Sequence, residues 1–315
     1  MKVIEHIEKA KETLLSIEIV PPERGKNINA ITDIIDALSQ YQPSWIDVTA
    51  HSSVANYHEN GDGSLERKIY KKRPGTIGIC GVIQNRYNID TVAHLLCDGF
   101  TKEETEDALI ELNFLGVNNV LALKGDSLNY KKSVSRDRSV NNYACDLVEQ
   151  VSNMKNGVFL NELADSKFLD FGIGVAGYPE KHFEAPSLRS DIKYLKQKVD
   201  KGAEYIVTQM FFDNQCYFDF VDLCRSAGIT VPIVPGLKII RNARQLKSLA
   251  KSFHISIPDE LIDEITENQE RAFDIGIEWS IRQCQELLEH NVPSLHFYIM
   301  NDEKSLLQVL KGIKR

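Results

Sequence analysis

Short apolar runs rich in β-branched and aromatic residues recur along the chain, each followed by a segment with helical periodicity. The runs are too continuous for strands that keep one face in water, so they predict parallel strands buried on both faces. There are eight such runs: Leu14–Val20, Trp45–Ala50, Thr91–Cys97, Asn118–Lys124, Phe171–Tyr178, Tyr205–Phe212, Val231–Leu237 and Ser294–Met300.

Helical segments are predicted between these runs. Residues 28–38 place apolar side chains on one helical stripe, and Thr101 followed by two glutamates is a typical capping start. Asp191 is expected to open another helix, and Ser252–Glu270 to add an extra helix before the last strand. Residues 74–87 fit either a helix capped by Thr76 or a strand.

Eight strand-then-helix units in 315 residues match a closed (βα)8 TIM barrel better than an open doubly wound sheet. The chain contains no Pro/Gly/Ser-rich linker and no low-complexity tract. We therefore expect residues 1–315 to form a single domain.

Composition and charge narrow the class of protein. Hydrophobic residues make up 43% of the chain and charged residues 26%, which excludes a disordered or fibrous protein. The formal net charge of −8 gives no positive field for nucleic acid or an anionic membrane. The six cysteines form no C-x-x-C pair, and no stretch approaches 18 apolar residues, so we expect a cytoplasmic protein outside the membrane.

In a barrel of this kind the chemistry lies at the C-terminal ends of the strands. The predicted strand ends are rich in polar side chains. They supply Glu18, Thr49, His51, His94, Lys124, Gly125, Asp126, Tyr178, Glu180, His182, Gln209, Lys238, Tyr298 and Asn301.

Two carboxylates are the main catalytic candidates. Glu18 lies among β-branched residues, where burial would raise its pKa and make it a general acid near neutral pH. The alternative is a structural carboxylate bridged to a Lys or Arg. Asp126 follows Gly125, which permits a tight turn and close approach of a ligand, although Asp126 could instead cap a helix.

An aromatic ring, an imidazole and a cation follow the fifth predicted strand, as Tyr178, His182 and Lys198. This combination suits a flat heterocycle with a phosphate-bearing tail. Taken alone, His182 fits an ordinary loop histidine and His94 a satisfied core histidine.

Two other motifs carry less weight. The G-x-G-x-x-G spacing at Gly172–Gly177 lies inside a strand run rather than between a strand and a helix, so it indicates strand glycines, not a dinucleotide turn. His51, His94 and His182 lack close ligand spacing, so no metal site is predicted.

Separated motifs in a fixed order resemble the methylenetetrahydrofolate reductase family. The matches cover the chain nearly end to end, and Y-P-E-x-H and T-Q-x-F-F-D are the most specific among them. They are S-I-E-I-V-P-P at 16–22, D-V-T at 47–49, A-H-L-L-C at 93–97, A-L-K-G-D at 122–126, A-G-Y-P-E-K-H-F-E-A at 176–185, K-V-D-K-G-A at 198–203, T-Q-M-F-F-D at 208–213, V-P-G at 234–236 and H-F-Y at 296–298.

The resemblance implies a (βα)8 barrel that holds noncovalent FAD and takes NAD(P)H and methylenetetrahydrofolate in turn, within a homo-oligomer. Lys124 stands where many relatives have Arg. The implied FAD contacts are Thr49, His94, Lys124, Gly125, Asp126, Tyr178, His182, Asp191 and Lys198. The implied substrate contacts are Glu18, Asp126, Gln209, Gln245, Leu249 and Tyr298.

The implied roles follow from the reaction. Hydride cannot add to the closed five-membered ring of the folate, so Glu18 would protonate that ring and open it to an iminium cation. Asp126 would stabilise the cation and make the flavin a stronger hydride donor. Gln209 would bond to the pterin edge, and Tyr298 would help to position the substrate.

Two competing interpretations remain. A barrel of another chemistry, such as an aldolase or a metal-dependent hydrolase, would need a Schiff-base lysine or a carboxylate–histidine cluster, and neither is evident. A non-catalytic relative would bind flavin or folate and act through a partner subunit. The presence of both Glu18 and Asp126 argues against that interpretation.

Overall fold

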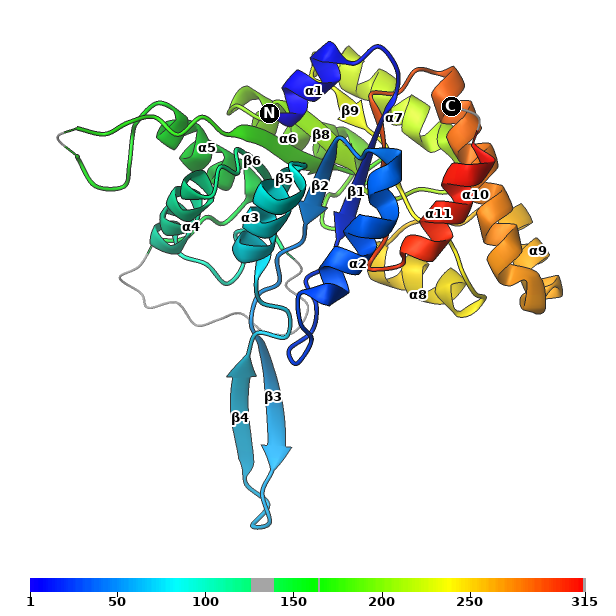
Figure 1. The fold of residues 1–315 in the computed structure, drawn as a ribbon, viewed down its shortest axis with the longest axis horizontal. Helices are drawn as coiled ribbons and strands as arrows, with labels where there is room; N and C mark the ends of the chain where they lie inside the picture. Colours follow the sequence, from blue (N-terminus) through cyan, green and yellow to red (C-terminus); the bar gives the residue numbers. More distant parts are fainter. Residues whose placement is uncertain (126–138, 164, 314–315) are drawn as a thin grey trace.

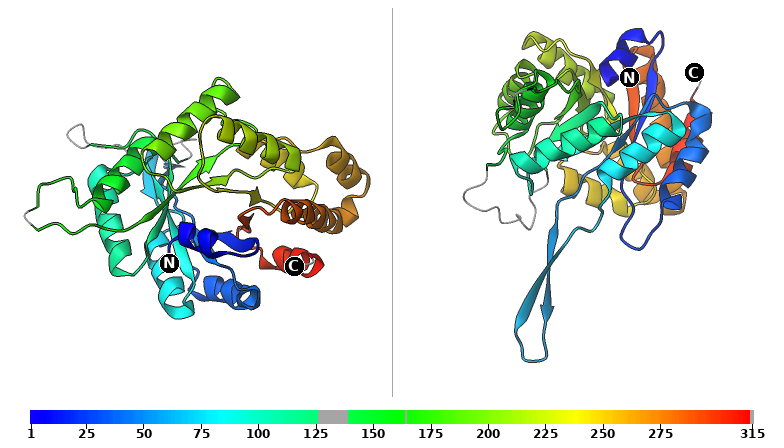
Figure 2. Two further views of the ribbon diagram at one scale, coloured as in Figure 1. Left: turned by 90° about the horizontal axis from the view of Figure 1, so that it is seen from above. Right: turned by 60° about the vertical axis from the view of Figure 1, so that its left-hand side comes forward.

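The computed structural model describes residues 1–125, 139–163 and 165–313. Its centre is a ring of parallel strands with helices outside it (Figure 1, Figure 2). The order of pairing is β10-β11-β1-β2-β5-β6-β7-β8-β9, which confirms the predicted barrel. The strands are β1 Leu14–Ile19, β2 Trp45–Val48, β5 Asp90–Leu96, β6 Asn119–Leu123, β7 Gly172–Gly177, β8 Tyr205–Thr208, β9 Ile233–Val234, β10 Gly236–Leu237 and β11 Ser294–Tyr298.

The seventh predicted strand is broken into β9 and β10 at Pro235, where the sequence analysis expected one continuous strand. Proline has no backbone N–H to donate, so the ladder is interrupted there. The Pro235 carbonyl still accepts the His296 N–H at 3.1 Å, and β9 pairs with β8 while β10 pairs with β11. The ring is therefore closed through one short segment. A Cβ atom at Gly236 would lie 2.2 Å from the Thr208 carbonyl oxygen, so this closure needs glycine.

Helices follow the strands as expected. Within residues 74–87 the structure has a helix from Thr76 to Tyr87 rather than a strand, but Gly75 and not Thr76 is its N-cap residue. An extra helix, α9, lies in the predicted region before the last strand. The helices are α1 Val3–Lys9, α2 Asn29–Leu38, α3 Thr76–Tyr87, α4 Lys102–Phe114, α5 Ala144–Lys155, α6 Leu188–Asp200, α7 Asn214–Ser226, α8 Arg244–Phe253, α9 Asp259–Glu267, α10 Ala272–Glu289 and α11 Glu303–Gly312.

Helix starts test the capping predictions. Thr101 caps α4 in a reciprocal box: its hydroxyl accepts the Glu104 N–H at 3.1 Å, and its own N–H donates to the Glu104 carboxylate at 2.8 Å. The expectation that Asp191 opens a helix is wrong by one turn. Helix α6 begins at Leu188 because Ser187 is the residue whose hydroxyl accepts a first-turn N–H.

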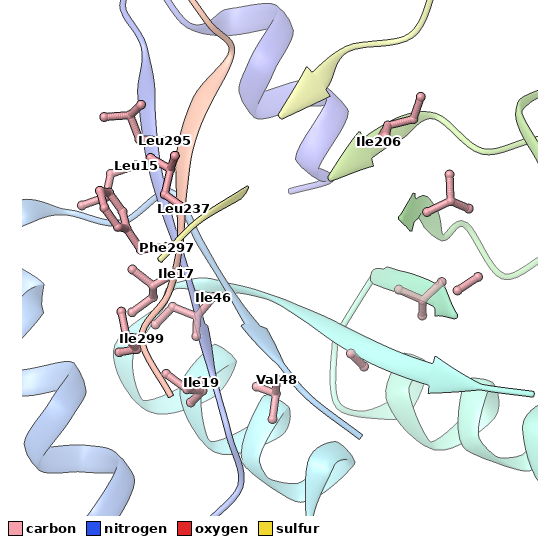
Figure 3. Packing of buried hydrophobic residues seen from close by; sticks show 14 of the residues in the cluster. Leu15, Ile17, Ile19, Ile46, Val48, Ile206, Leu237, Leu295, Phe297 and Ile299 are labelled. Atoms are coloured by element: carbon pink, nitrogen blue, oxygen red, sulfur yellow. The ribbon is translucent and has the colours of Figure 1, made fainter. Parts of the chain in front are cut away.

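The alternation of β1 separates a core from a site. Leu15, Ile17 and Ile19 are buried in the cluster between the strands and the outer helices (Figure 3). Ser16 and Glu18, on the opposite face, contact histidines inside the ring. Every second side chain of the strand is thus available to the barrel interior.

Helix α1 covers the N-terminal end of the barrel. Val3 is fully buried with Trp45, Leu121 and Tyr205, and its N–H donates to the Asn119 side chain at 2.8 Å. The interior is therefore filled at this end, and the C-terminal mouth is left for a ligand. Within the described ranges, no helix is long and apolar enough to span a bilayer.

A two-stranded hairpin, here called the arm, leaves the barrel between β2 and α3 and projects away from it (Figure 1). It consists of β3 (Val54–Glu59) and β4 (Leu65–Tyr70), paired antiparallel. The hydrophobic pattern did not predict it, because both faces are largely exposed and neither carries the apolar run of a buried strand.

Candidate functional site

Glu18 and His94 meet at the C-terminal mouth. Strand β1 carries Glu18 and β5 carries His94, and the Glu18 Oε2 lies 3.5 Å from the His94 Nε2. Burial raises the Glu18 pKa to about 8, although Lys238 opposes the shift, and burial lowers the His94 pKa to about 3. Near neutral pH both side chains are therefore uncharged, so this contact is not an ion pair.

Lys238 and Tyr298 flank Glu18. The Lys238 ammonium donates to the Tyr298 carbonyl at 2.7 Å, and burial, with Arg241 next, lowers its pKa to about 8. The Tyr298 hydroxyl donates to the Thr208 carbonyl at 2.5 Å. Strand β11 thus holds Tyr298 beside the acid, where the sequence placed a substrate contact.

A second buried carboxyl lies inside the barrel, and the sequence analysis missed it. Asp47 is the strand-register partner of Glu18 and is fully buried, with its Oδ1 at 3.4 Å from the His296 Nε2. The other ring nitrogen of His296 lies 3.0 Å from the Ser16 hydroxyl. Burial raises the Asp47 pKa and lowers that of His296 to about 3, so this pair also favours the uncharged forms. The signal was available: Asp47 occupies the inward position of its strand, between Trp45 and Thr49.

Thr49 and His51 follow β2 at the same mouth. The Thr49 hydroxyl lies 3.0 Å from the His51 Nε2, and the Thr49 carbonyl accepts the Thr76 hydroxyl at 2.9 Å. The second bond fixes the loop to the start of α3. Thr49 is therefore held at the rim by a packed helix.

Lys124 and Gly125 lie after β6, the strand that pairs with β5. The Lys124 ammonium forms an ion pair with Glu184 at 2.5 Å, and 27% of the lysine side chain is exposed. Gly125 adopts φ +96°, a conformation that favours glycine. The predicted Asp126 lies outside the described residues.

The loop after β7 arranges an aromatic pair. The rings of Tyr178 and His182 meet edge to face with centroids 4.5 Å apart. The backbone N–H of His182 donates to the Asp191 carboxylate at 2.8 Å. Helix α6, which carries Asp191, therefore anchors this loop. Burial lowers the His182 pKa, and the neutral ring is favoured.

Lys198 reaches the same region from α6. Its ammonium donates to the Ala176 carbonyl at 2.8 Å. Burial lowers its pKa to about 8, and the Asp191 carboxylate acts in the opposite direction. A partly desolvated cation here would gain from an anionic ligand.

The remaining predicted substrate contacts lie after β8 and in α8. Gln209 follows β8 and borders a small pocket that Tyr178 and His254 also line. Gln245, in α8, accepts the Arg241 N–H at 2.6 Å. Leu249 is 5% exposed and packs in a hydrophobic cluster that Tyr298 also contacts.

The donor set fits a nucleotide with an aromatic ring system. Lys124 and Lys198 supply cations for phosphate, and Tyr178 with His182 supplies stacking surface. Among the described residues, no group of three or more His, Cys, Asp and Glu side chains is placed to hold a metal ion.

Comparisons with known proteins agree with this geometry. A family model described as methylenetetrahydrofolate reductase matches residues 2–314. Methylenetetrahydrofolate reductase (NADH) 1 of Arabidopsis thaliana is 33% identical, with 99% of this chain and 51% of that protein covered. The 5,10-methylenetetrahydrofolate reductase of Escherichia coli is 30% identical, with 91% and 86% covered. The chain thus spans about half the length of its plant relative and most of the bacterial one.

A solved structure supports the fold. It is an uncharacterized protein from Clostridium thermocellum whose name states that it binds two copies of 5-methyl-5,6,7,8-tetrahydrofolic acid. Its TM-score is 0.57 at 13% identity, with 98% of each chain covered. At this identity the likeness concerns the fold alone.

Proposed function

Because the chain belongs to the methylenetetrahydrofolate reductase family, we propose that it reduces 5,10-methylenetetrahydrofolate to 5-methyltetrahydrofolate with NAD(P)H and FAD. One observation carries the proposal beyond the family. It is the buried Glu18 carboxyl at the barrel mouth, whose pKa of about 8 keeps it protonated near neutral pH.

Glu18 supplies the proton that opens the folate ring. Below about pH 8 its carboxyl holds a proton, and His94 beside it, with a pKa of about 3, is too weak a base to remove it. Lys238 favours the carboxylate that forms after transfer, because its positive charge lowers the Glu18 pKa. His94 therefore leaves the proton on Glu18 before the reaction, and Lys238 favours its release during the reaction.

The residues beside β6, β7 and α6 would hold the cofactor. Lys124 and Lys198 would meet the diphosphate of FAD, and Tyr178, His182 and Asp191 would position its ring-bearing portions. Thr49 and Gly125 complete the rim. When bound, FAD would accept hydride from NAD(P)H and pass it to the folate.

Gln209 and Tyr298 would orient the folate next to Glu18, and Asp126 would stabilise positive charge. Gln245 and Leu249 stay proposed contacts at the α8 side. Since the Leu249 side chain is buried, its contribution would be to support the α8 wall.

The test is an anaerobic spectral titration of the purified chain. We expect bound FAD to lose its visible absorption on addition of NAD(P)H, and methylenetetrahydrofolate then to restore it. A protein that takes up no FAD contradicts the proposal.

The same titration separates the competing functions. A non-catalytic relative would bind FAD but would not pass hydride to the folate. An enzyme of another chemistry would leave methylenetetrahydrofolate unchanged in the presence of reduced FAD.

A further inference from the structure

The arm is a sheet without a third strand. Among the described residues, β3 and β4 pair only with each other and join no barrel strand. An isolated two-stranded hairpin is marginally stable in water, whereas three or more strands with a hydrophobic face are stable. The arm therefore has the geometry of an incomplete sheet.

One face of the arm, here called the apolar face, carries three large apolar side chains beside two charged ones. The strand register places Tyr57 opposite Arg67, Ala55 opposite Ile69 and Glu59 opposite Leu65, so all six side chains share a face. On it Tyr57 is 63% exposed, Leu65 67% and Ile69 51%. These side chains give the arm the hydrophobic face that a sheet of three or more strands needs to be stable in water.

The two edges of the arm differ in charge. Strand β4 places Glu66, Arg67 and Lys68 in succession. If two copies of β4 paired about a twofold axis at one of these residues, that residue would lie opposite its own copy and two like charges would meet. This disfavours pairing of β4 with β4 of a second chain. Strand β3 carries one charged residue, Glu59, at its end.

Within the part of the chain that the structure describes, the outer edge of β3 pairs with no strand. At the hairpin turn the Asn60 N–H donates to the Ser64 carbonyl at 2.8 Å. Hydrogen-bonded pairs recur at every second residue of an antiparallel ladder, so the backbone groups of Ala55, Tyr57 and Glu59 face the open edge.

We propose that two copies of this chain associate through their arms, with β3 of one pairing antiparallel with β3 of the other to form a four-stranded sheet. A twofold axis at Tyr57 places that residue opposite its copy and Ala55 opposite Glu59, with no like charges opposed. The axis is normal to the sheet, so the apolar faces of both arms lie on the same side.

The overall shape permits this arrangement. The arm projects away from the barrel in both views that show its length (Figure 1, Figure 2). Antiparallel arms place the two barrels at opposite ends of the shared sheet. The barrels therefore do not compete for space.

The experiment is disulfide trapping in the full chain. Directly opposed residues of an antiparallel pair have Cα atoms roughly 4.5–5.5 Å apart, within the range that a disulfide spans. We expect Tyr57→Cys to give a covalent dimer on mild oxidation. The matched control is Arg67→Cys, across the same hairpin on the other edge, which should stay largely uncrosslinked, as should the wild type, whose native cysteines all lie outside the arm.

A second variant replaces residues 54–70 with a short Gly/Ser linker. Light scattering should show that the mass of the particle falls by half relative to the wild type. Crosslinking of Arg67→Cys in preference to Tyr57→Cys, a monomeric wild type, or an unchanged mass after removal of the arm would each overturn the proposal. None of these readouts depends on the folate reaction.

Discussion

Two neighbouring regions of the barrel mouth, the uncharged side around β1 and β5 and the charged side around β6 and α6, treat charge in opposite ways. Around β1 and β5, burial removes charge: the Glu18 pKa rises to about 8 and the His94 pKa falls to about 3. Around β6 and α6, charge is kept and paired, as in the half-exposed Lys124–Glu184 bridge. One end of a barrel can thus hold a proton donor and an anion site without either neutralising the other.

Replacement of Glu18 is expected to have the largest effect, and it tests whether the uncharged side supplies the proton. Glu18→Gln keeps the shape but removes the transferable proton, so folate reduction should fall about 10²–10⁴-fold. FAD reduction by NAD(P)H should change little. Stopped-flow absorbance measures the two half-reactions separately, and equal loss in both would show that Glu18 acts on the cofactor rather than on the folate.

The pH dependence of the folate step should come next in size. An acid whose pKa is raised keeps its proton to higher pH, so the rate should be level below about pH 8 and fall roughly tenfold per pH unit above it. His94 does not contribute, since its pKa of about 3 leaves it neutral throughout. A folate half-reaction that accelerates between pH 8 and 9 would contradict the role of a protonated Glu18.

The acid side of the mouth was largely predictable from sequence. A glutamate in an apolar run at the end of a strand stays buried if it faces the barrel interior. Strand β1 places Glu18 in that position. His94, which taken alone fits a core histidine, contacts Glu18 from β5. What sequence could not show was their 3.5 Å contact, because it depends on how the strands stagger across the ring.

Three other features were not predicted from the sequence, and each has a physical reason. The Asp47–His296 pair joins residues 249 positions apart along the chain (296 minus 47), and only the closed ring brings them together. Lys124 meets Glu184 because β6 and β7 are neighbours, which the order of pairing decides. The arm escaped detection because an exposed ribbon lacks the apolar periodicity on which strand prediction relies.

On the charged side, Lys198→Met should weaken FAD binding about tenfold or more, because a charged hydrogen bond contributes roughly 1.5–3 kcal/mol. Lys193→Met, at an exposed position of the same helix, is the matched control and should bind FAD normally. Fluorescence titration of the apoprotein gives both affinities. If the two variants bind alike, the partly buried lysine is structural and the anion site lies elsewhere.

The smallest effect is expected at Tyr298, which joins the uncharged side to the point where the barrel closes. Its hydroxyl donates to the Thr208 carbonyl at 2.5 Å, next to the close approach of Gly236. Tyr298→Phe keeps the ring and leaves no large cavity, so the free energy of unfolding should fall by about 1 kcal/mol through the lost bond. Urea denaturation measures this change. FAD affinity should be unaltered, because the residue lies on the acid side of the mouth. If Tyr298→Phe lost FAD binding without a loss of stability, Tyr298 would contribute to the cofactor site. Proton transfer and anion binding would then not be separated between the two sides of the mouth.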